Sequence, residues 1–378
     1  MPGSKSSKGR LPRVRWTAAL AVLPLLAAAC GGGTGGQSGD GRSVKLAYAS
    51  PLPKGGLNYG FDWWADEVEK RTDGQVTFER HYAGSMFGVQ ETFAALGDGR
   101  VDVGWLGSAF FPAELPLFSI AGVPFQTDHP LGQAGAFYEL WKSNEAFQSE
   151  WEEHGVRPII FQPWSGGVMG TKKPMDSIDK LKGLRLRTVG FVAPAMSELG
   201  VETVAIPTEE LYEAIQRGVV DGYAPFSFDR SIVDAGVTDV APYTLDLRIG
   251  HYAQAPIAMS QQTWSKLPED VQKVLTEVAE EFMFEQALDL YTQQQTETCD
   301  HILQNGGTVT RFSDAQRDEL EKRVKNVSLE TWLGNTKKQG VDQQVVEEFR
   351  EQFLAEHDRI ASEVDYEPGA EACASRKQ

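Results

Sequence analysis

Apolar residues recur along the chain at two spacings, which predict strands alternating with helices. Between residues 61 and 68 they stand at positions i, i+3, i+4 and i+7, the spacing of one helix face. From Gln75 to His81, Val76 and Phe78 alternate with polar residues, which is the period of a strand. Over residues 44–105 the predicted order is strand, helix, strand, helix, strand. That order predicts an α/β domain with a doubly wound sheet.

A second unit of the same kind follows farther along the chain. In the predicted strand from Leu184 to Thr188, alternate side chains face opposite sides, so Leu186 and Arg187 point apart. A helix follows, with Thr208 as its expected N-cap and Gly218 as the left-handed residue that ends it. The next strand starts directly after this glycine. Strand, connection, helix and strand in this order imply a parallel pair of strands.

The longest periodic segment runs from Pro268 to about Asn305 and predicts one long helix. The segments near Trp164 and near His251 are the predicted points where the chain crosses between two lobes. Two lobes are also expected because residues 44–378 exceed what one hydrophobic core usually holds. The predicted division assigns residues 44–163 plus 251–290 to lobe I, residues 164–250 plus 291–364 to lobe II, and residues 365–378 to a tail.

The first 29 residues are predicted to be an export signal rather than part of the fold. Basic residues precede an apolar run, Trp16 to Ala29, which is too short to span a bilayer and contains Pro24. Small residues precede Cys30 as at a lipoprotein cleavage site, so Cys30 is the predicted lipidation site; a single buried cysteine is the alternative. Residues 30–43 are rich in Gly and Ser and predict a flexible tether. We therefore expect an extracytoplasmic protein with a lipid anchor in the cell membrane.

The charge balance excludes one large class of partners. The chain has 36 Lys and Arg residues against 53 Asp and Glu residues. Without the five basic residues of the predicted signal, 31 remain against 53, a net charge of −22. Such an acidic protein is not expected to bind nucleic acid or an anionic membrane surface. An anionic solute would need a local cationic group, because the field of the whole protein repels it.

The sequence contains no recognised catalytic or metal-binding motif. It has no Gly-x-Ser-x-Gly, His-Glu-x-x-His, Walker or Cys-x-x-Cys pattern, and none of its six histidines lies at metal-ligand spacing from another. Paired acids such as Glu209-Glu210 lie on predicted helices and are interpreted as solvated faces. We therefore expect neither an enzyme nor a cofactor or metal site.

The chain has two cysteines besides Cys30, namely Cys299 and Cys373. In an oxidising extracytoplasmic space such a pair can form a disulfide. The bond would join the acidic tail to the end of the long helix. Two free thiols are the alternative, and the sequence leaves both open.

Two of the stretches described above resemble a known family. Residues 182–187 read Lys-Gly-Leu-Arg-Leu-Arg, and residues 210–222 read Glu-Leu-Tyr-Glu-Ala-Ile-Gln-Arg-Gly-Val-Val-Asp-Gly. Together they are similar to the signature of TRAP-transporter solute-binding proteins, and a weaker resemblance extends from about Val44 to Phe284. The resemblance implies a two-lobed, periplasmic-binding-protein-like clamshell with a long helix along both lobes. It also implies that Arg187 grips the solute carboxylate, whereas spacing alone favours an ordinary strand Arg paired with a surface acid.

Two other residues of that family's site have no counterpart in this chain. Relatives carry a second solute-contacting Arg about where Gly166 or Gly167 stands, and an Asn in the stretch matching residues 223–228. The resemblance therefore does not extend to a dicarboxylate or sialic-acid site, and we expect one gripped carboxylate with an apolar or neutral remainder. Trp105 falls at the carboxyl end of a predicted strand, where α/β sheets bind ligands, with a core position as an equal alternative. The aromatic residues expected to wall the site are Trp105, Trp164, Phe226 and Phe228.

Three classes of function remain at this point. The first is a monomeric solute-binding lipoprotein that delivers a small organic acid to the membrane subunits of a TRAP permease. The second is the same fold used as a sensor that presents its ligand to a receptor. The third is a lipoprotein enzyme with an unrecognised site. The export signal favours the first two equally, and the family resemblance favours the first.

Overall fold

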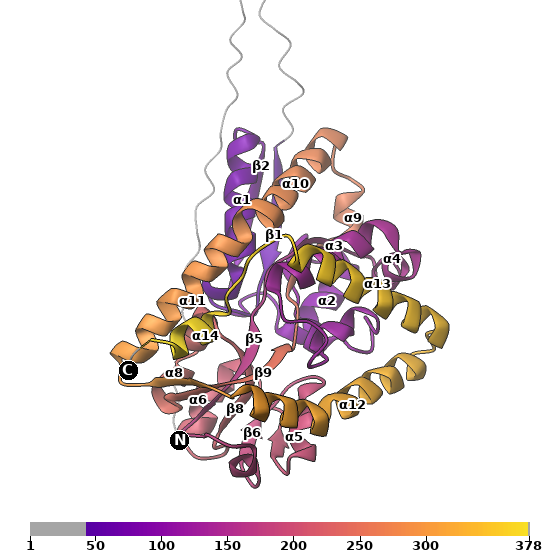
Figure 1. Ribbon diagram of the computed structural model, residues 1–378. Coiled ribbons are helices and arrows are strands. Elements are labelled where there is room, and N and C mark those ends of the chain that lie inside the picture. Colours follow the sequence, from indigo (N-terminus) through magenta and orange to yellow (C-terminus); the bar gives the residue numbers. More distant parts are fainter. Residues whose placement is uncertain (1–42, 377–378) are drawn as a thin grey trace, which may run out of the picture. The chain divides into compact units, whose positions relative to one another are not determined.

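The computed structural model describes residues 43–376. The predicted export signal, Cys30 and all but the last residue of the predicted tether lie outside the described residues. Within the described part, the fold is built on two mixed β-sheets, one of five and one of six strands, with helices packed against each (Figure 1). This confirms the α/β class expected from the alternating patterns.

The first sheet has the strand order β2-β1-β3-β10-β4. Strand β1 runs parallel to β2 and β3, whereas β10 runs antiparallel to β3 and β4. The strands are β1 (Val44–Ala49), β2 (Val76–His81), β3 (Val103–Trp105), β4 (Val156–Phe161) and β10 (Pro256–Ser260). The helices next to them are α1 (Tyr59–Arg71), α2 (Val89–Gly97), α3 (Pro130–Ser143), α4 (Glu145–Glu152) and α9 (Gln261–Trp264). The helical apolar pattern of α1 is confirmed, because Phe61, Trp64 and Val68 are fully buried.

The second sheet has the strand order β11-β9-β5-β8-β6-β7. Strand β6 runs parallel to both β7 and β8, which confirms the predicted parallel pair. The strands are β5 (Gly166–Thr171), β6 (Arg185–Arg187), β7 (Glu202–Val204), β8 (Gly222–Ser227), β9 (Tyr243–His251) and β11 (Thr308–Arg311). Four helices lie in the connections between these strands: α5 (Val192–Glu198), α6 (Thr208–Gln216), α7 (Arg230–Asp234) and α8 (Val237–Val240).

Helix α6 differs at its start from the sequence prediction. The helix begins at Thr208 itself and follows Pro207, and no side chain caps its first turn, so the prediction of Thr208 as N-cap is wrong. The Thr208 hydroxyl instead accepts a hydrogen bond from Arg187 of strand β6. At the other end, Gly218 has a φ of 73°, as the predicted left-handed cap requires.

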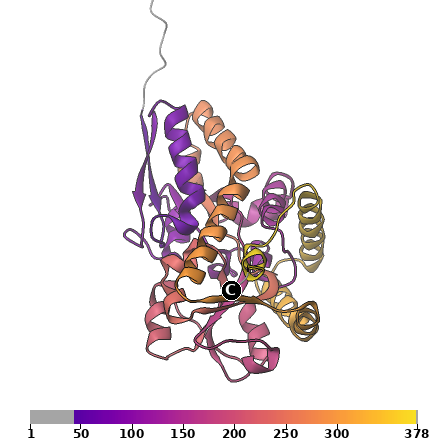
Figure 2. The same cartoon turned by 60° about the vertical axis from the view of Figure 1, so that its left-hand side comes forward.

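The predicted long helix is confirmed and is continuous over 36 residues. It consists of α10 (Glu269–Glu281), a π-helical turn (Phe282–Gln286) and α11 (Ala287–Gln304). Its first half packs against α1, where the Trp64 indole N–H donates to the Leu275 carbonyl over 3.0 Å. Its second half packs against α7 and β11 of the other sheet. Figures 1 and 2 show this helix in orange, passing from the elements of one sheet to those of the other.

The C-terminal helices do not stay with one sheet. Helix α12 (Asp314–Lys338) packs against α5, but α13 (Gln343–Ala361) packs against α3 beside the first sheet. Aromatic contacts hold α13 there, with the Phe353 ring 4.5 Å from Phe137 and the Phe349 ring 5.2 Å from Phe147. Residues 291–364 were predicted to belong to the second lobe, and the contacts of α13 with α3 differ from that division.

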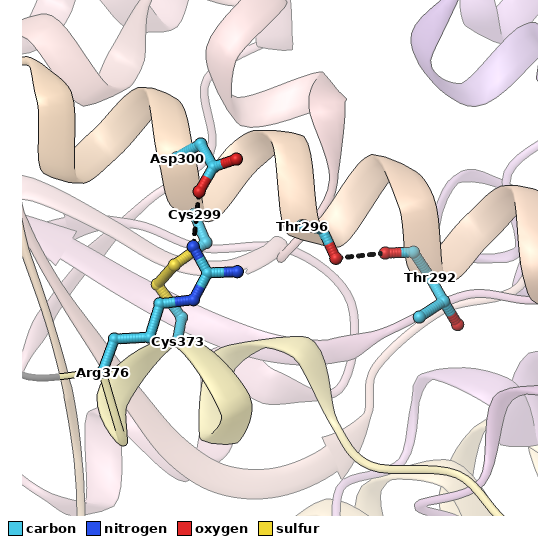
Figure 3. Close-up of a disulfide and its surroundings, with 6 residues drawn as sticks. All are labelled: Thr292, Thr296, Cys299, Asp300, Cys373 and Arg376. Carbon is cyan, nitrogen blue, oxygen red and sulfur yellow. Dashed lines mark hydrogen bonds and ion pairs between the residues drawn. A yellow bond between two sulfur atoms is a disulfide. The ribbon is translucent and has the colours of Figure 1, made fainter.

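The chain end is folded rather than a free tail. Residues Gly369–Ala374 form helix α14, which packs against α11 and β11. A disulfide joins Cys373 of this helix to Cys299 of α11, with a Cα–Cα distance of 5.6 Å (Figure 3). Arg376 adds an ion pair with Asp300 beside it. Of the two alternatives left open by the sequence, the structure therefore contains the disulfide.

A buried polar cluster lies where the chain passes between the two sheets. The Ser165 hydroxyl, between β4 and β5, lies 2.8 Å from that of Ser227 at the end of β8. The Tyr291 hydroxyl of the long helix lies 3.2 Å from the Ser227 hydroxyl. Asp229 accepts hydrogen bonds from Ser227 and from the backbone of Ser231. The cluster links the crossing segment, the second sheet and the long helix at one point.

Candidate functional site

A cavity of about 340 Å³ lies between loops that follow strands of both sheets. From the first sheet, loop residues 51–53 and 55–57 and Trp105, the last residue of β3, line this cavity. From the second sheet it is lined by Arg187, the last residue of β6, and by Phe226 near the end of β8. The carboxyl ends of parallel strands are where α/β sheets bind ligands. The cavity therefore has the position of a binding site.

Arg187 is the buried cation of this cavity. The residue is 4% exposed, and burial lowers the pKa of its guanidinium while Tyr252 and Glu209 act in the opposite direction. Nε donates to the Ile206 carbonyl and Nη2 to the Thr208 hydroxyl, each over 3.1 Å. No carboxylate of residues 43–376 lies within ion-pair distance of it. The interpretation as a strand Arg paired with a surface acid therefore does not fit Arg187; it fits Arg185, which pairs with Asp221 over 3.5 Å.

The guanidinium retains hydrogen-bonding capacity toward the cavity. An arginine side chain carries five N–H groups, and two of them are used by Ile206 and Thr208. The remaining N–H groups have no acceptor among the described residues. A buried guanidinium that is oriented but incompletely paired can bind a planar anion through two parallel N–H donors.

Thr208 connects the guanidinium to the start of α6. Its hydroxyl oxygen accepts from Arg187, so the hydrogen of the same hydroxyl is left to donate elsewhere. Thr208 also lines the cavity. The hydroxyl can therefore orient Arg187 and donate to an oxygen of a bound molecule at the same time.

Aromatic side chains form much of the remaining wall. Trp105 and Trp164 lie with ring centroids 6.5 Å apart, and Trp164 makes an edge contact with Tyr252 at 6.0 Å. The guanidinium of Arg187 lies 5.8 Å from the centre of the Phe226 ring. Trp105 is 3% exposed; it packs in the core and also lines the cavity.

The structure brings together four of the five predicted binding residues, Arg187, Trp105, Trp164 and Phe226. Phe228 is not among the lining residues and is fully buried in a second core cluster. Strand β8 ends at Ser227, and the Phe228 N–H donates to the Ser165 hydroxyl over 2.6 Å. The two-residue period that relates Phe226 to Phe228 therefore does not continue past the strand end.

Several lining residues were not predicted, and they share a position at element ends. Tyr252 follows β9, Thr208 and Glu209 open α6, and residues 51–53 and 55–57 lie between β1 and α1. The available signal was topological: loops after neighbouring strands meet at one sheet edge. Sequence periodicity does not identify them, because it describes the elements and not their connections.

Residues 43–376 contain neither a cluster of metal-binding side chains nor a membrane-spanning helix. No group of three or more His, Cys, Asp or Glu side chains there is arranged to hold a metal ion. None of the helices in that range is long and apolar enough to cross a membrane.

The chain is similar to known proteins in sequence and in fold. The family described as "Bacterial extracellular solute-binding protein, family 7" matches residues 57–335. A monocarboxylate 2-oxoacid-binding periplasmic protein of Nostoc sp. is 25% identical over 327 residues, which cover 83% of this chain and 86% of the relative.

Solved structures share the same fold. A TRAP solute-binding protein from Rhodoferax ferrireducens, in complex with copurified benzoate, superposes with a TM-score of 0.74 at 19% identity, covering 84% of this chain and 99% of that one. A TRAP periplasmic solute-binding protein from Bordetella bronchiseptica, with bound (R)- and (S)-mandelate, gives a TM-score of 0.70 at 24% identity, with the same coverage of 84% and 99%.

Proposed function

The chain belongs to family 7 of the bacterial extracellular solute-binding proteins, and from this premise we propose that it captures a small organic carboxylate at Arg187 and delivers it to a TRAP-type permease. The family match covers residues 57–335, which include every strand of the two sheets except β1, and every residue that lines the cavity except those of the loop before residue 57. The observation that carries the proposal is the state of Arg187, a buried guanidinium at a cavity with no carboxylate of residues 43–376 paired to it.

The physical argument concerns the loss of water on binding. A carboxylate that enters a cavity loses its hydration, and a matched cation with good hydrogen bonds offsets that loss. Arg187 is already dehydrated and held by Ile206 and Thr208, so little of its own freedom remains to be lost. The site is therefore organised for an anion before one binds.

The walls of the cavity indicate the rest of the ligand. Trp105, Trp164 and Phe226 offer flat apolar surfaces around the guanidinium. The relatives named above bind benzoate, mandelate or 2-oxoacids, each of which joins one carboxylate to a small remainder. We infer a monocarboxylate with an aromatic or short aliphatic body as the solute.

The proposed mechanism is closure of two lobes around the solute. In this proposal lobe I comprises residues 44–163 plus 251–290, and lobe II comprises residues 164–250 plus 291–364. The polar cluster around Ser165 and Tyr291 would lie at the junction of the two lobes. Hinge closure of this kind is absorbed by a few residues at element ends. Small-angle scattering should show compaction when a binding carboxylate is added. Unchanged profiles at saturating ligand would contradict the closure but not the binding.

Attachment to the membrane completes the proposal. Residues 1–29 would be removed as an export signal, Cys30 would carry the lipid, and residues 30–43 would tether the binding domain outside the cytoplasm. Support comes from the sequence pattern alone. Radiolabelled fatty acid should be incorporated by the wild-type protein and not by Cys30→Ala, and a label retained in that variant would exclude Cys30 as the acceptor.

Calorimetry with benzoate, mandelate and 2-oxopentanoate tests the binding site. At least one of these should bind the wild-type protein and lose its affinity in Arg187→Ala. Arg185→Ala is the matched control, because Arg185 lies in the same strand with its side chain 41% exposed and is not among the cavity-lining residues. Equal loss in both variants would indicate damage to the strand rather than loss of a binding group.

A further inference from the structure

The cavity wall carries more acidic than basic side chains. Among the described residues that line it, Arg187 is the cationic one, and Glu209 and Asp234 carry carboxylates. A bound monocarboxylate would neutralise Arg187 and leave the two acids facing the remainder of the ligand. A second carboxylate on the ligand would meet a wall with no second cation.

Glu209 lines the cavity but is not part of any ion pair among the described residues. It is the second residue of α6, directly after the threonine that binds Arg187. Its side chain is exposed and has no hydrogen-bond or ion-pair partner within residues 43–376. It influences Arg187 electrostatically, since it acts to raise the pKa of that guanidinium. Glu209 is therefore a free acceptor at the cavity edge.

Asp234 lies where the two walls of the cavity meet. It ends α7, and its Oδ1 lies 3.2 Å from Nε of Arg230. The other oxygen, Oδ2, lies next to Gly56 in the loop of the first sheet. A Cβ atom added to Gly56 would be only 3.0 Å from it. Burial raises the pKa of this carboxyl. One oxygen is thus compensated by a cation, and the other lies against the loop of the first sheet that lines the cavity.

We propose that Glu209 and Asp234 set the charge selectivity of the cavity: they favour a monocarboxylate whose far end carries a hydrogen-bond donor or a positive charge, and they exclude a second carboxylate. The inference rests on the proposed function, because Arg187 must hold the first carboxylate. Like charges brought together in a partly dehydrated site repel strongly, whereas a hydroxyl or ammonium group finds two acceptors. The solute class is therefore a hydroxy- or amino-substituted monocarboxylic acid rather than a diacid.

A series of benzoates with one variable group tests this directly. The 3-position carries hydrogen, hydroxyl, aminomethyl or carboxylate, and the last two groups are similar in size but opposite in charge. A parallel pair, 2-oxopentanoate and 2-oxoglutarate, replaces a terminal methyl group by a carboxylate. In the wild-type protein the diacid of each pair should bind at least about tenfold more weakly than its monoacid.

The variants Glu209→Gln and Asp234→Asn should narrow that gap by about threefold or more each and should weaken binding of 3-(aminomethyl)benzoate. Glu210→Gln is the matched control, since Glu210 is the next acid on α6 and does not line the cavity. Diacids that bind as tightly as monoacids, or equal effects of Glu209→Gln and Glu210→Gln, would overturn the inference while leaving the proposed function intact. Absence of binding by every carboxylate in both series would overturn the proposed function itself.

Discussion

Arg187 and Glu150 are both buried ionisable side chains, but their surroundings differ. Glu150 of α4 lies beside the first sheet, and its two oxygens accept the backbone N–H groups of Leu117 and Phe118. Those N–H groups lie at the start of the 3-10 helix Phe118–Gly122, so the carboxyl group of Glu150 caps this helix. Arg187 lies at a cavity and has N–H groups to spare. Glu150 satisfies hydrogen-bond donors of the fold, whereas Arg187 keeps donors that the fold does not satisfy.

The difference shows how a structural charge is told from a binding one. Burial alone does not separate them, because both residues are more than nine-tenths buried. What separates them is whether the protein itself supplies every hydrogen bond of the buried group. Removing a satisfied group should lower stability, whereas removing an unsatisfied group at a cavity should lower affinity.

The largest expected effect is the loss of affinity in Arg187→Ala. Breaking a buried charge pair by removing one partner costs about 3–5 kcal/mol, which corresponds to two orders of magnitude or more in affinity. Arg187→Lys should keep only part of the affinity, because an ammonium group cannot make two parallel N–H bonds. Calorimetry with the best-binding carboxylate measures both variants. A folded Arg187→Ala protein that binds within about threefold of wild type would refute the role of this residue.

Removal of the disulfide should affect stability and leave affinity unchanged. Cys299 and Cys373 are 74 residues apart in sequence, and a disulfide typically contributes about 2–4 kcal/mol to stability. Replacing both by Ser should lower the free energy of unfolding in urea by that amount. Binding should persist, because neither cysteine lines the cavity. Two alkylatable thiols in the native, unreduced wild-type protein would show that the bond does not form.

Glu150→Gln should also lower stability without changing affinity. One acceptor oxygen becomes a donor, so a buried backbone N–H loses its partner at a cost of about 1–3 kcal/mol. Burial raises the pKa of Glu150 to about 8, against 4.5 ordinarily, although its two backbone hydrogen bonds act to lower it. The folded state then binds an extra proton between these values, so stability falls as pH rises from about 4.5 to about 8.

Urea titrations across that range test the pH dependence. The slope should be flatter in Glu150→Gln than in wild type, because the variant has no proton to release. Glu152→Gln, at an exposed position of the same helix, is the control and should retain the wild-type slope. Identical slopes in all three proteins would assign the pH dependence to other groups.

The smallest expected effect is that of the Thr208 hydroxyl. Thr208→Val keeps the shape and removes one hydrogen bond to Arg187 together with the donor that remains free. A neutral hydrogen bond contributes about 0.5–1.5 kcal/mol, so affinity should fall by about three- to tenfold. Thr208→Ser retains the hydroxyl and should bind nearly as wild type. Equal affinities of the Val and Ser variants would show that the hydroxyl contributes nothing.

The sequence by itself determined the regular elements and the identity of the buried cation. The parallel pairing of β6 with β8 followed from the order of strand, helix and strand, and the long helix followed from one apolar periodicity. Arg187 was found through the resemblance of residues 182–187 to a family signature, not through spacing. These features are local, because each depends on side chains only a few positions apart in the chain.

The tertiary structure decided what each buried face meets. Thr208 was expected to cap its own helix and instead binds a side chain of the neighbouring strand. Helix α13 was expected on the second lobe and instead buries its Phe side chains against α3. Phe228 has the same residue type and nearly the same sequence context as Phe226, yet only Phe226 lines the cavity. Periodicity reports that a face is buried, but the partner that buries it comes from a distant part of the chain. Only the folded chain brings the loops of two sheets together around one arginine.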